Sequence, residues 1–275
     1  MTYRNIIMQK IIVVTGATDG IGLETAKMLV EQGHHLVVHG RNPQKTTDVV
    51  TKLQALSNQA KVESVVADLS NLKSVTAMVS ELAERFGKID VLINNAGVFS
   101  TGNPITNDGL DVRFVVNTIA PYYLTKELLP LLGTSGRVVN LSSAAQAPVN
   151  LSALEGVQTL GDGEAYAQSK LALTMWSRSL GLANQNKGPM IVAVNPKSFL
   201  GSKMVKDAYG VAGGDLKLGA DILVRAALST EFDAAHGKYF DNDIEAFAKP
   251  HSQAFDEAKV KQVISTIENQ IAQLA

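Results

Sequence analysis

Residues 10–22 read Lys-Ile-Ile-Val-Val-Thr-Gly-Ala-Thr-Asp-Gly-Ile-Gly, and this stretch decides the expected fold. A short run of β-branched residues leads into a turn with glycines at positions 16, 20 and 22. Such glycines let the backbone turn tightly and approach a pyrophosphate, which then lies at the N-terminus of the following helix. The spacing is Gly-x-x-x-Gly-x-Gly rather than the more common Gly-x-Gly-x-x-Gly. A plain tight turn between a strand and a helix is therefore the alternative.

Short apolar runs alternate with longer amphipathic ones along the rest of the chain, which is typical of repeated strand–helix units. Buried strands are expected at Lys10–Thr15, Leu36–His39, Val62–Ala67, Val91–Asn94, Arg137–Leu141 and Met190–Asn195. Helices are expected at Gly22–Gln32, Pro43–Ser57, Leu72–Phe86, Asp111–Leu132 and Glu164–Asn184, with Pro121 as a candidate kink. Strands that are hydrophobic throughout suit a parallel sheet covered on both faces. The prediction is an α/β fold with a doubly wound parallel β-sheet, in a single domain over residues 1–275.

Two irregular segments interrupt this alternation. Residues 144–163 separate the fifth strand from the fifth helix, and residues 197–216 follow the sixth strand. Long loops at the carboxyl ends of parallel strands are where α/β folds build their sites. Both segments are therefore expected to be substrate loops.

Composition excludes several classes of function. The formal net charge of −1 gives no electrostatic reason to expect nucleic acid or an anionic membrane surface as a partner. The absence of Cys excludes disulfides and thiolate catalysis, and the five His show no metal-ligand spacing, so no metal site is expected. No Gly-x-Ser-x-Gly elbow points to a serine hydrolase. The first ten residues show no signal peptide, and no apolar run is long enough to span a membrane, so a cytoplasmic protein is expected.

The end of the second strand bears on the choice of cofactor. A fold that binds NAD commonly places an acidic residue there for the ribose 2′-hydroxyl, whereas this chain reads Val-Val-His-Gly-Arg41. The planar guanidinium of Arg41 suits a 2′-phosphate, which favours NADP(H) over NAD(H). A solvated surface arginine is the alternative. Asp68, with Leu69, is expected to border the adenine, unless Asp68 caps a helix instead.

Tyr166 and Lys170 are four residues apart in a predicted helix, so they share a face. A nearby lysine cation favours the phenolate and lowers the pKa of tyrosine from its ordinary value of about 10. Lowering that pKa to about 7–8 requires roughly 3–4 kcal/mol, which predicts a second cation or dipole near the pair. Tyr-x-x-x-Lys by itself occurs often by chance.

Together these motifs resemble the short-chain dehydrogenase/reductase family, and the likeness extends from about Lys10 to Val194. The matching motifs are Thr-Gly-x-x-x-Gly-x-Gly at 15–22, Asn-Asn-Ala-Gly at 94–97, the serine pair at 142–143, and Tyr166-x-x-x-Lys170. The resemblance implies an NAD(P)-dependent oxidoreductase that interconverts a carbonyl and an alcohol by hydride transfer. The oxidised nicotinamide would then supply the second cation.

The resemblance also implies roles for individual residues. Tyr166 would be the acid/base, Lys170 would lower its pKa, and both would contact the cofactor. Ser143 would hold the substrate oxygen, although the pattern of strand ends alone does not separate it from Ser142. Asn117 would hold a water on a proton relay to Lys170, and its alternative role is to satisfy a backbone group.

The same resemblance implies which residues line the cofactor site. Its members in this sequence would be Gly16, Thr18, Asp19, Gly20, Ile21, Gly22, Arg41, Asp68, Leu69, Asn94, Ala96, Gly97 and Pro196. One departure is Lys197, which stands where the family often has glycine after Pro196 and puts the detail of that turn in doubt.

A second departure is the long step from Ser143 to Tyr166. It is similar to retinol-dehydrogenase-like and protochlorophyllide-reductase-like groups, and Gly237-Lys-Tyr-Phe240 also resembles the former. These features favour a bulky apolar substrate.

Members of the family commonly pair two helices across a subunit interface. The matching segments here are 111–132 and 164–184, so the resemblance implies a homodimer or homotetramer. The alternatives are a catalytically silent dinucleotide-sensing regulator and an epimerase or dehydratase on the same scaffold.

Overall fold

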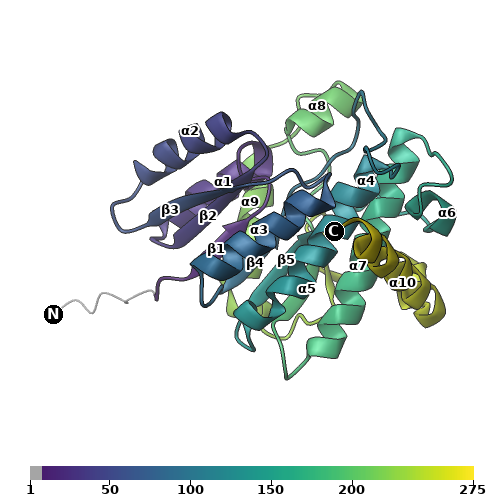
Figure 1. Cartoon of the computed structure of the whole chain (residues 1–275). Helices are drawn as coiled ribbons and strands as arrows, with labels where there is room; N and C mark the ends of the chain where they lie inside the picture. The colour runs from purple at the N-terminus through teal and green to yellow at the C-terminus, as the bar shows by residue number, and fades with distance from the viewer. Residues whose placement is uncertain (1–7) are drawn as a thin grey trace.

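The computed structural model describes residues 8–275, and within them the strands form one twisted eight-stranded sheet (Figure 1). Its order is β3-β2-β1-β4-β5-β6-β7-β8, and every neighbouring pair is parallel except β7 with β8. The strands are β1 Ile11–Val14, β2 His35–Gly40, β3 Lys61–Val66, β4 Val91–Asn94, β5 Arg137–Leu141, β6 Met190–Asn195, β7 Tyr239–Asp241 and β8 Ala246–Ala248. The predicted absence of a signal peptide rests largely on residues 1–7, which lie outside the described residues.

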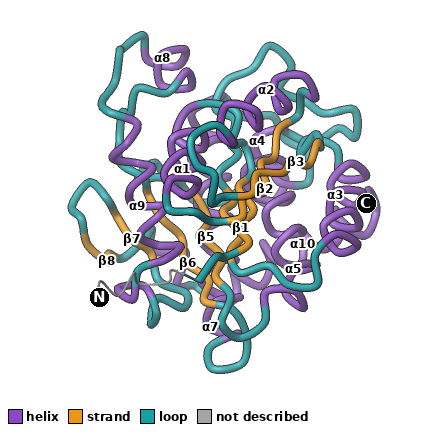
Figure 2. Tube along the Cα trace, turned by 90° about the vertical axis from the view of Figure 1, so that its left-hand side faces the viewer, coloured by secondary structure: helices purple, strands orange, loops and turns teal. Residues whose placement is uncertain are grey.

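Helices cover both faces of the sheet, as the view turned by 90° shows (Figure 2). They are α1 Gly20–Glu31, α2 Pro43–Gln54, α3 Leu72–Arg85, α4 Val112–Phe114, α5 Ala120–Leu132, α6 Leu151–Leu154, α7 Asp162–Asn184, α8 Lys203–Tyr209, α9 Leu216–Leu228 and α10 Glu257–Leu274. Alternate residues of β1 enter two separate cores, because successive side chains of a strand point to opposite faces. Val13 packs with α3, α5 and α7, whereas Ile12 and Val14 pack with α1 and α9. The predicted doubly wound α/β fold is confirmed.

The helix predicted over Asp111–Leu132 is divided into three parts. A π-helical segment, Val115–Ile119, separates α4 from α5. Pro121, the candidate kink, lies in the first turn of α5, directly after the π-helical segment that interrupts the regular helix. Proline lacks an N–H and its ring collides with the carbonyl four residues earlier, and the wider π turn accommodates both effects.

Each predicted loop contains a short helix. Residues 144–163 include α6, whose first amides are capped by the Asn150 side chain, and α7 already begins at Asp162. Residues 197–216 include α8, where the Ser202 hydroxyl accepts a hydrogen bond from the Val205 N–H. Helices as short as α6, with four residues, and α8, with seven, have too few residues to show the hydrophobic period of a helix.

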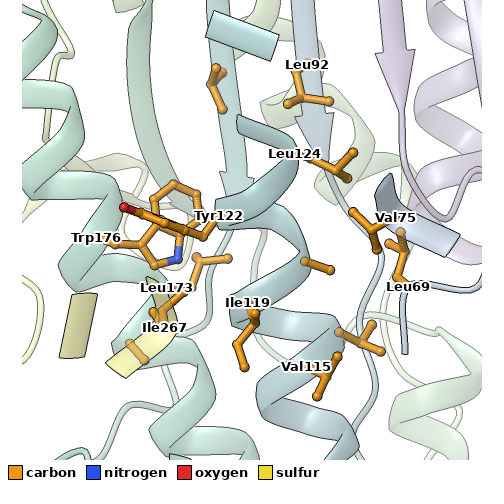
Figure 3. Close-up of a cluster of buried hydrophobic side chains, with 14 of the residues drawn as sticks. Leu69, Val75, Leu92, Val115, Ile119, Tyr122, Leu124, Leu173, Trp176 and Ile267 are labelled. Carbon is orange, nitrogen blue, oxygen red and sulfur yellow. The ribbon is translucent and has the colours of Figure 1, made fainter. Parts of the chain in front are cut away.

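Helix α10 packs against α7, and its residue Ile267 lies beside Trp176 and Leu173 in the close-up of Figure 3. The Tyr122 hydroxyl on α5 donates a hydrogen bond to Glu268, 2.6 Å away, and the rings of Tyr122 and Trp176 meet edge to face. Burial and the Glu268 carboxylate raise the pKa of Tyr122, which keeps this hydroxyl a donor. The chain's own C-terminal helix therefore covers part of the surface that α5 and α7 present.

Candidate active site

A cavity of about 640 Å³ opens where the parallel strands end, on the side of their carboxyl termini. The strand order reverses between β1 and β4, and such a switch point is where open α/β sheets bind ligands. The predicted site residues that line this cavity are Gly16, Thr18, Asp19, Gly20, Ile21, Gly22, Arg41, Asp68, Leu69, Ala96, Gly97, Ser143, Tyr166, Lys170 and Pro196. Residues predicted from separate strand ends thus meet around one space.

The glycine-rich loop has a conformation that only glycine adopts easily. Gly16 and Gly20 have φ angles of 64° and 56°. A Cβ atom at Gly22 would lie 2.3 Å from the Gly16 carbonyl oxygen and 2.4 Å from the Asn95 amide nitrogen. Asp19 caps α1 through a 2.9 Å hydrogen bond from the Gly20 N–H. This loop therefore brings backbone amides and the positive end of α1 to the cavity.

Two side chains that the sequence analysis did not assign hold this loop in place. The Gly16 N–H donates a hydrogen bond to Nδ1 of His39, and Nε2 of His39 therefore carries the proton and donates to the Ala67 carbonyl, 3.0 Å away. Burial lowers the pKa of His39 to about 4, so the ring is neutral. The amide of Asn95 donates to the carbonyls of Thr15 and Gly16. The one feature of the sequence that could have pointed to this role of His39 is its position at the end of a predicted strand, beside Gly40.

Asn94 does not line the cavity, although it was expected to border the ribose. Its side chain is 3% exposed and donates to Asn140 and Thr125 beneath the sheet edge. A one-residue step along an extended chain reverses the direction of the side chain. The neighbouring Asn95 consequently faces the cavity instead.

The end of the cavity nearest β2 is basic. Arg41 and Lys45 both line it, and a Cβ atom at Gly40 would lie 2.4 Å from the Thr46 hydroxyl. Lys45 donates a 2.9 Å hydrogen bond to Asp19, and this contact lowers the pKa of the Asp19 carboxyl. Lys45 was missed by the sequence analysis, although it follows Arg41 by four residues.

The opposite end of the cavity brings Tyr166 and Lys170 together on one face of α7. The Lys170 side chain is 3% exposed, and its Nζ lies 5.6 Å from the centroid of the Tyr166 ring. Nζ also donates a 2.7 Å hydrogen bond to the Leu141 carbonyl. Burial lowers the pKa of Lys170 to about 7, so its positive charge is readily lost at neutral pH.

The structure distinguishes the two serines at the end of β5. Both line the cavity, but Ser142 is buried and its hydroxyl lies 2.7 Å from the hydroxyl of Thr174 on α7. Ser143 is partly exposed, lines the cavity with Tyr166, and accepts a hydrogen bond from the Ala145 N–H. Ser143 is thus the serine whose hydroxyl can reach a molecule in the cavity.

Asn117 lies in the π-helical segment and bonds backbone groups. Its Oδ1 accepts from the Val98 N–H at 2.8 Å, and its Nδ2 donates to the Val98 carbonyl and to the Ser169 hydroxyl. A Cβ atom at Gly97 would lie 3.5 Å from Oδ1 of Asn117 and 3.7 Å from Nζ of Lys170. Asn117 is not itself among the lining residues, and its polar atoms tie the β4–α4 loop to α7.

The loop after β4 lies against the end of the cavity that holds Tyr166 and Lys170. The Phe99 ring lies 4.8 Å from the Tyr166 ring, centroid to centroid. Next to it, the Ser100 hydroxyl donates to Asp162 at 2.7 Å, and buried Arg113 donates to the same carboxylate. The larger apolar residues that line the cavity after the glycine-rich loop include Val98, Phe99, Val112, Val116, Phe199, Leu200, Met204 and Val205.

The fold and the residues gathered around this cavity define an NAD(P)-dependent oxidoreductase. The chain belongs to the short chain dehydrogenase family, whose sequence model matches residues 10–209. The resemblance drawn from the motifs is therefore confirmed.

Named relatives agree with this assignment. Human polyprenol dehydrogenase is 32% identical over 257 residues, which cover 86% of this chain and 78% of the relative. Mouse retinol dehydrogenase 12 is 32% identical over 244 residues, covering 84% and 77%. A solved short chain dehydrogenase from Burkholderia cenocepacia in complex with NADP is 25% identical, with a TM-score of 0.67 over 85% of this chain and 95% of that one.

Among the helices within residues 8–275, none combines the length and apolar character that a membrane crossing requires.

Proposed function

We propose that this protein is an NADPH-preferring oxidoreductase that interconverts a carbonyl and an alcohol, with Tyr166 as acid/base. The observation that carries the proposal is the arrangement of one cavity, which has a glycine-rich loop and two basic residues at one end. Its other end holds Ser143, Tyr166 and Lys170. A dinucleotide bound along the cavity would reach from the first group to the second.

The residues present fit a dinucleotide. Positive φ angles at Gly16 and Gly20 bring the backbone to the cavity, and the N-terminus of α1 suits a pyrophosphate. Arg41 and Lys45 are donors for a 2′-phosphate. When bound, the nicotinamide supplies the hydride chemistry. Asp68, Leu69, Ala96, Gly97 and Pro196 also line the cavity, where the first two would border the adenine and Ala96 and Gly97 the ribose.

The chain's own groups would manage the substrate oxygen. Ser143 would donate a hydrogen bond to it, and the Tyr166 hydroxyl would give it a proton in reduction or take one in oxidation. Lys170, while protonated, would favour the phenolate form of Tyr166, since its Nζ lies 5.6 Å from the centroid of the Tyr166 ring. Asn117 would contribute by holding Val98 and Ser169 in place, with its proposed relay water as a further role.

The substrate is proposed to be bulky and apolar. Phe99, Val112, Val116 and Met204 give the acid/base end an apolar wall. Two of the named relatives are a retinol and a polyprenol dehydrogenase. A long hydrocarbon alcohol or aldehyde would bury this wall more fully than a small polar one.

The expected cytoplasmic location and the homo-oligomer stay predictions. A subunit interface built on α5 and α7 would have to leave the contacts of α10 intact, including the Tyr122–Glu268 hydrogen bond. Sedimentation velocity of the full chain would measure the oligomeric state.

The test of the function is turnover of a series of aldehydes and ketones of increasing apolar bulk, followed by nicotinamide absorbance. Tyr166→Phe should lower kcat by about 10²–10⁴-fold, while the NADPH dissociation constant changes little. Tyr123→Phe is the matched control, because its hydroxyl lies 3.2 Å from Thr76 and it does not line the cavity. Full activity in Tyr166→Phe would refute the assignment. NADPH binding without turnover of any substrate would favour the dinucleotide-sensing alternative, and product isomerisation without net absorbance change would favour an epimerase.

A further inference from the structure

The turn after β6 holds two non-glycine residues in an uncommon backbone conformation. Lys197 has a φ angle of 122° and Phe199 has a φ angle of 53°. L-amino acids rarely adopt positive φ, and such residues persist only where the surrounding structure holds them. Asn195, Pro196 and Ser198 complete this turn, and all five residues line the cavity.

A carboxylate from a remote hairpin is bonded to this turn. Oδ1 of Asp243 accepts from the Ser198 N–H at 2.9 Å, and Oδ2 accepts from the Ser198 hydroxyl at 2.5 Å. The Asn195 side chain donates to Oδ2 of Asp243 at 2.9 Å and to Asp241 at 2.8 Å. Burial by itself would raise the pKa of Asp243, but the hydrogen bonds from Ser198 and the charge of Lys197 outweigh it and lower that pKa, so the acceptor is ionised at neutral pH.

Asn242, directly before Asp243 in the hairpin, adds hydrogen bonds to the same turn. The Asn242 N–H donates to the Asn195 carbonyl at 3.1 Å, which extends the pairing of β6 with β7. The buried Asn242 side chain donates to the Pro196 carbonyl at 2.9 Å and to the Leu218 carbonyl at 3.3 Å. The residues on both sides of Lys197 are thus fixed from outside their own segment.

The hairpin also reaches the other wall of the acid/base end. The Tyr239 hydroxyl on β7 donates to the Ser143 carbonyl at 3.1 Å. Burial and the carboxylates of Asp241 and Asp243 raise the pKa of Tyr239, so it remains a donor. One hairpin therefore supports Ser143 from one side and the 195–199 turn from the other.

We propose that the β7–β8 hairpin is a positioning device for the cavity, and that Asp243 is the positioning residue that holds Lys197 and Phe199 in their strained conformations against the dinucleotide. The inference rests on the proposed function. Without the Asp243 carboxylate, the turn relaxes to ordinary φ angles and leaves the cavity wall. Binding of the cofactor then has to restore the turn, which weakens binding.

The test is a double-mutant cycle between Asp243→Asn and Lys197→Gly. The asparagine side chain would present an NH₂ group where Asp243 now accepts hydrogen bonds, so the NADPH dissociation constant should rise about tenfold. Glycine adopts positive φ at little cost. In the Lys197→Gly background, Asp243→Asn should therefore raise the NADPH dissociation constant by only about twofold. Asn186→Gly relieves a positive φ of 66° just after α7, at the opposite end of β6 from the turn, and should leave NADPH binding unchanged.

Hydrogen exchange of the Ser198 amide, measured without cofactor, separates this inference from the proposed function. Asp243→Asn should raise the exchange rate at Ser198 whether or not the parent chain binds NADPH. Failure of the parent chain to bind NADPH would refute only the proposed function. Equal effects of Asp243→Asn in the parent and in the Lys197→Gly background would overturn the positioning role. Unchanged exchange at Ser198 would overturn it as well. A lower melting temperature with unchanged NADPH affinity would reduce Asp243 to a purely structural residue and contradict the proposal.

Discussion

The imidazole of His39 accepts a hydrogen bond from the backbone N–H of Gly16 at 3.1 Å, which couples the end of β2 to the glycine-rich loop. Nδ1 can accept this bond only while it is unprotonated. The cavity wall at the phosphate end therefore depends on a histidine that remains neutral.

This dependence predicts a loss of stability in acid. The pKa of His39 is about 4 in the folded protein and about 6.5 in the unfolded chain, so the unfolded state takes up a proton first as the pH falls. The free energy of unfolding should lose up to roughly 3 kcal/mol from this group between about pH 6.5 and pH 4. Urea unfolding of the parent and of His39→Asn across this range measures it. Across this range the free energy of unfolding should fall further in the parent than in His39→Asn by about this amount, and equal falls would contradict the assignment.

Preference for NADPH should depend on Arg41 and Lys45. Arg41→Ala should lower the ratio of kcat/KM for NADPH to that for NADH by about tenfold or more, because a charge-assisted contact to the 2′-phosphate is lost. Lys45→Ala should act in the same direction and less strongly, since Lys45 already pairs with Asp19. Lys27→Ala is the control, because Lys27 pairs with Glu24 on α1 and does not line the cavity. A ratio unaffected by Arg41→Ala would remove this residue from the site.

Replacing Lys170 should stabilise the protein while abolishing turnover. Burial lowers the pKa of Lys170 from 10.5 to about 7, so the unfolded chain binds the proton more tightly and folding is penalised at neutral pH. Lys170→Met should raise the free energy of unfolding at pH 7 by roughly 1–3 kcal/mol, after the lost hydrogen bond to the Leu141 carbonyl is subtracted.

The gain from Lys170→Met should shrink as the pH rises from about 7 to 10.5, because over that window the unfolded parent chain gradually loses its advantage in binding this proton. Denaturant unfolding at several pH values tests both the sign and the window. Lys217→Met, at an exposed position, should show neither the gain nor the loss of activity. If Lys170→Met were less stable than the parent by the same amount at pH 7 and at pH 10, burial of the lysine charge would not limit the stability of the parent.

Close packing predicts opposite outcomes for two glycine substitutions. Gly22→Ala would place a Cβ atom 2.3 Å from the Gly16 carbonyl, so it should destabilise the protein by about 1–3 kcal/mol and weaken NADPH binding. Gly163→Ala, in the first turn of α7, meets nothing within 4 Å and should be neutral or stabilising by up to about 1 kcal/mol. Thermal unfolding and NADPH titration of both variants distinguish these effects.

Much of the fold was predictable because its signals are local. The hydrophobic period separates strand from helix within a few residues, and the glycines at 16, 20 and 22 mark the turn after β1. The departures occurred where local signals are weak or conflict. Nothing in the sequence indicated that a π-helical segment precedes Pro121, the candidate kink, and α6 and α8 were too short to show a period.

The sequence by itself determined the α/β class, the glycine-rich turn and the Tyr166–Lys170 pair, since each follows from chain geometry over at most a few helical turns. Only the tertiary structure decided that the buried Ser142 contacts Thr174 while Ser143 stays partly exposed at the cavity. It also decided that Asn95 lines the cavity in place of Asn94, and that His39, Lys45 and Asp243 support the site. These choices depend on which way a side chain points at a strand end and on contacts between segments tens of residues apart. Such contacts form only when the sheet is assembled, and no spacing along the chain encodes them.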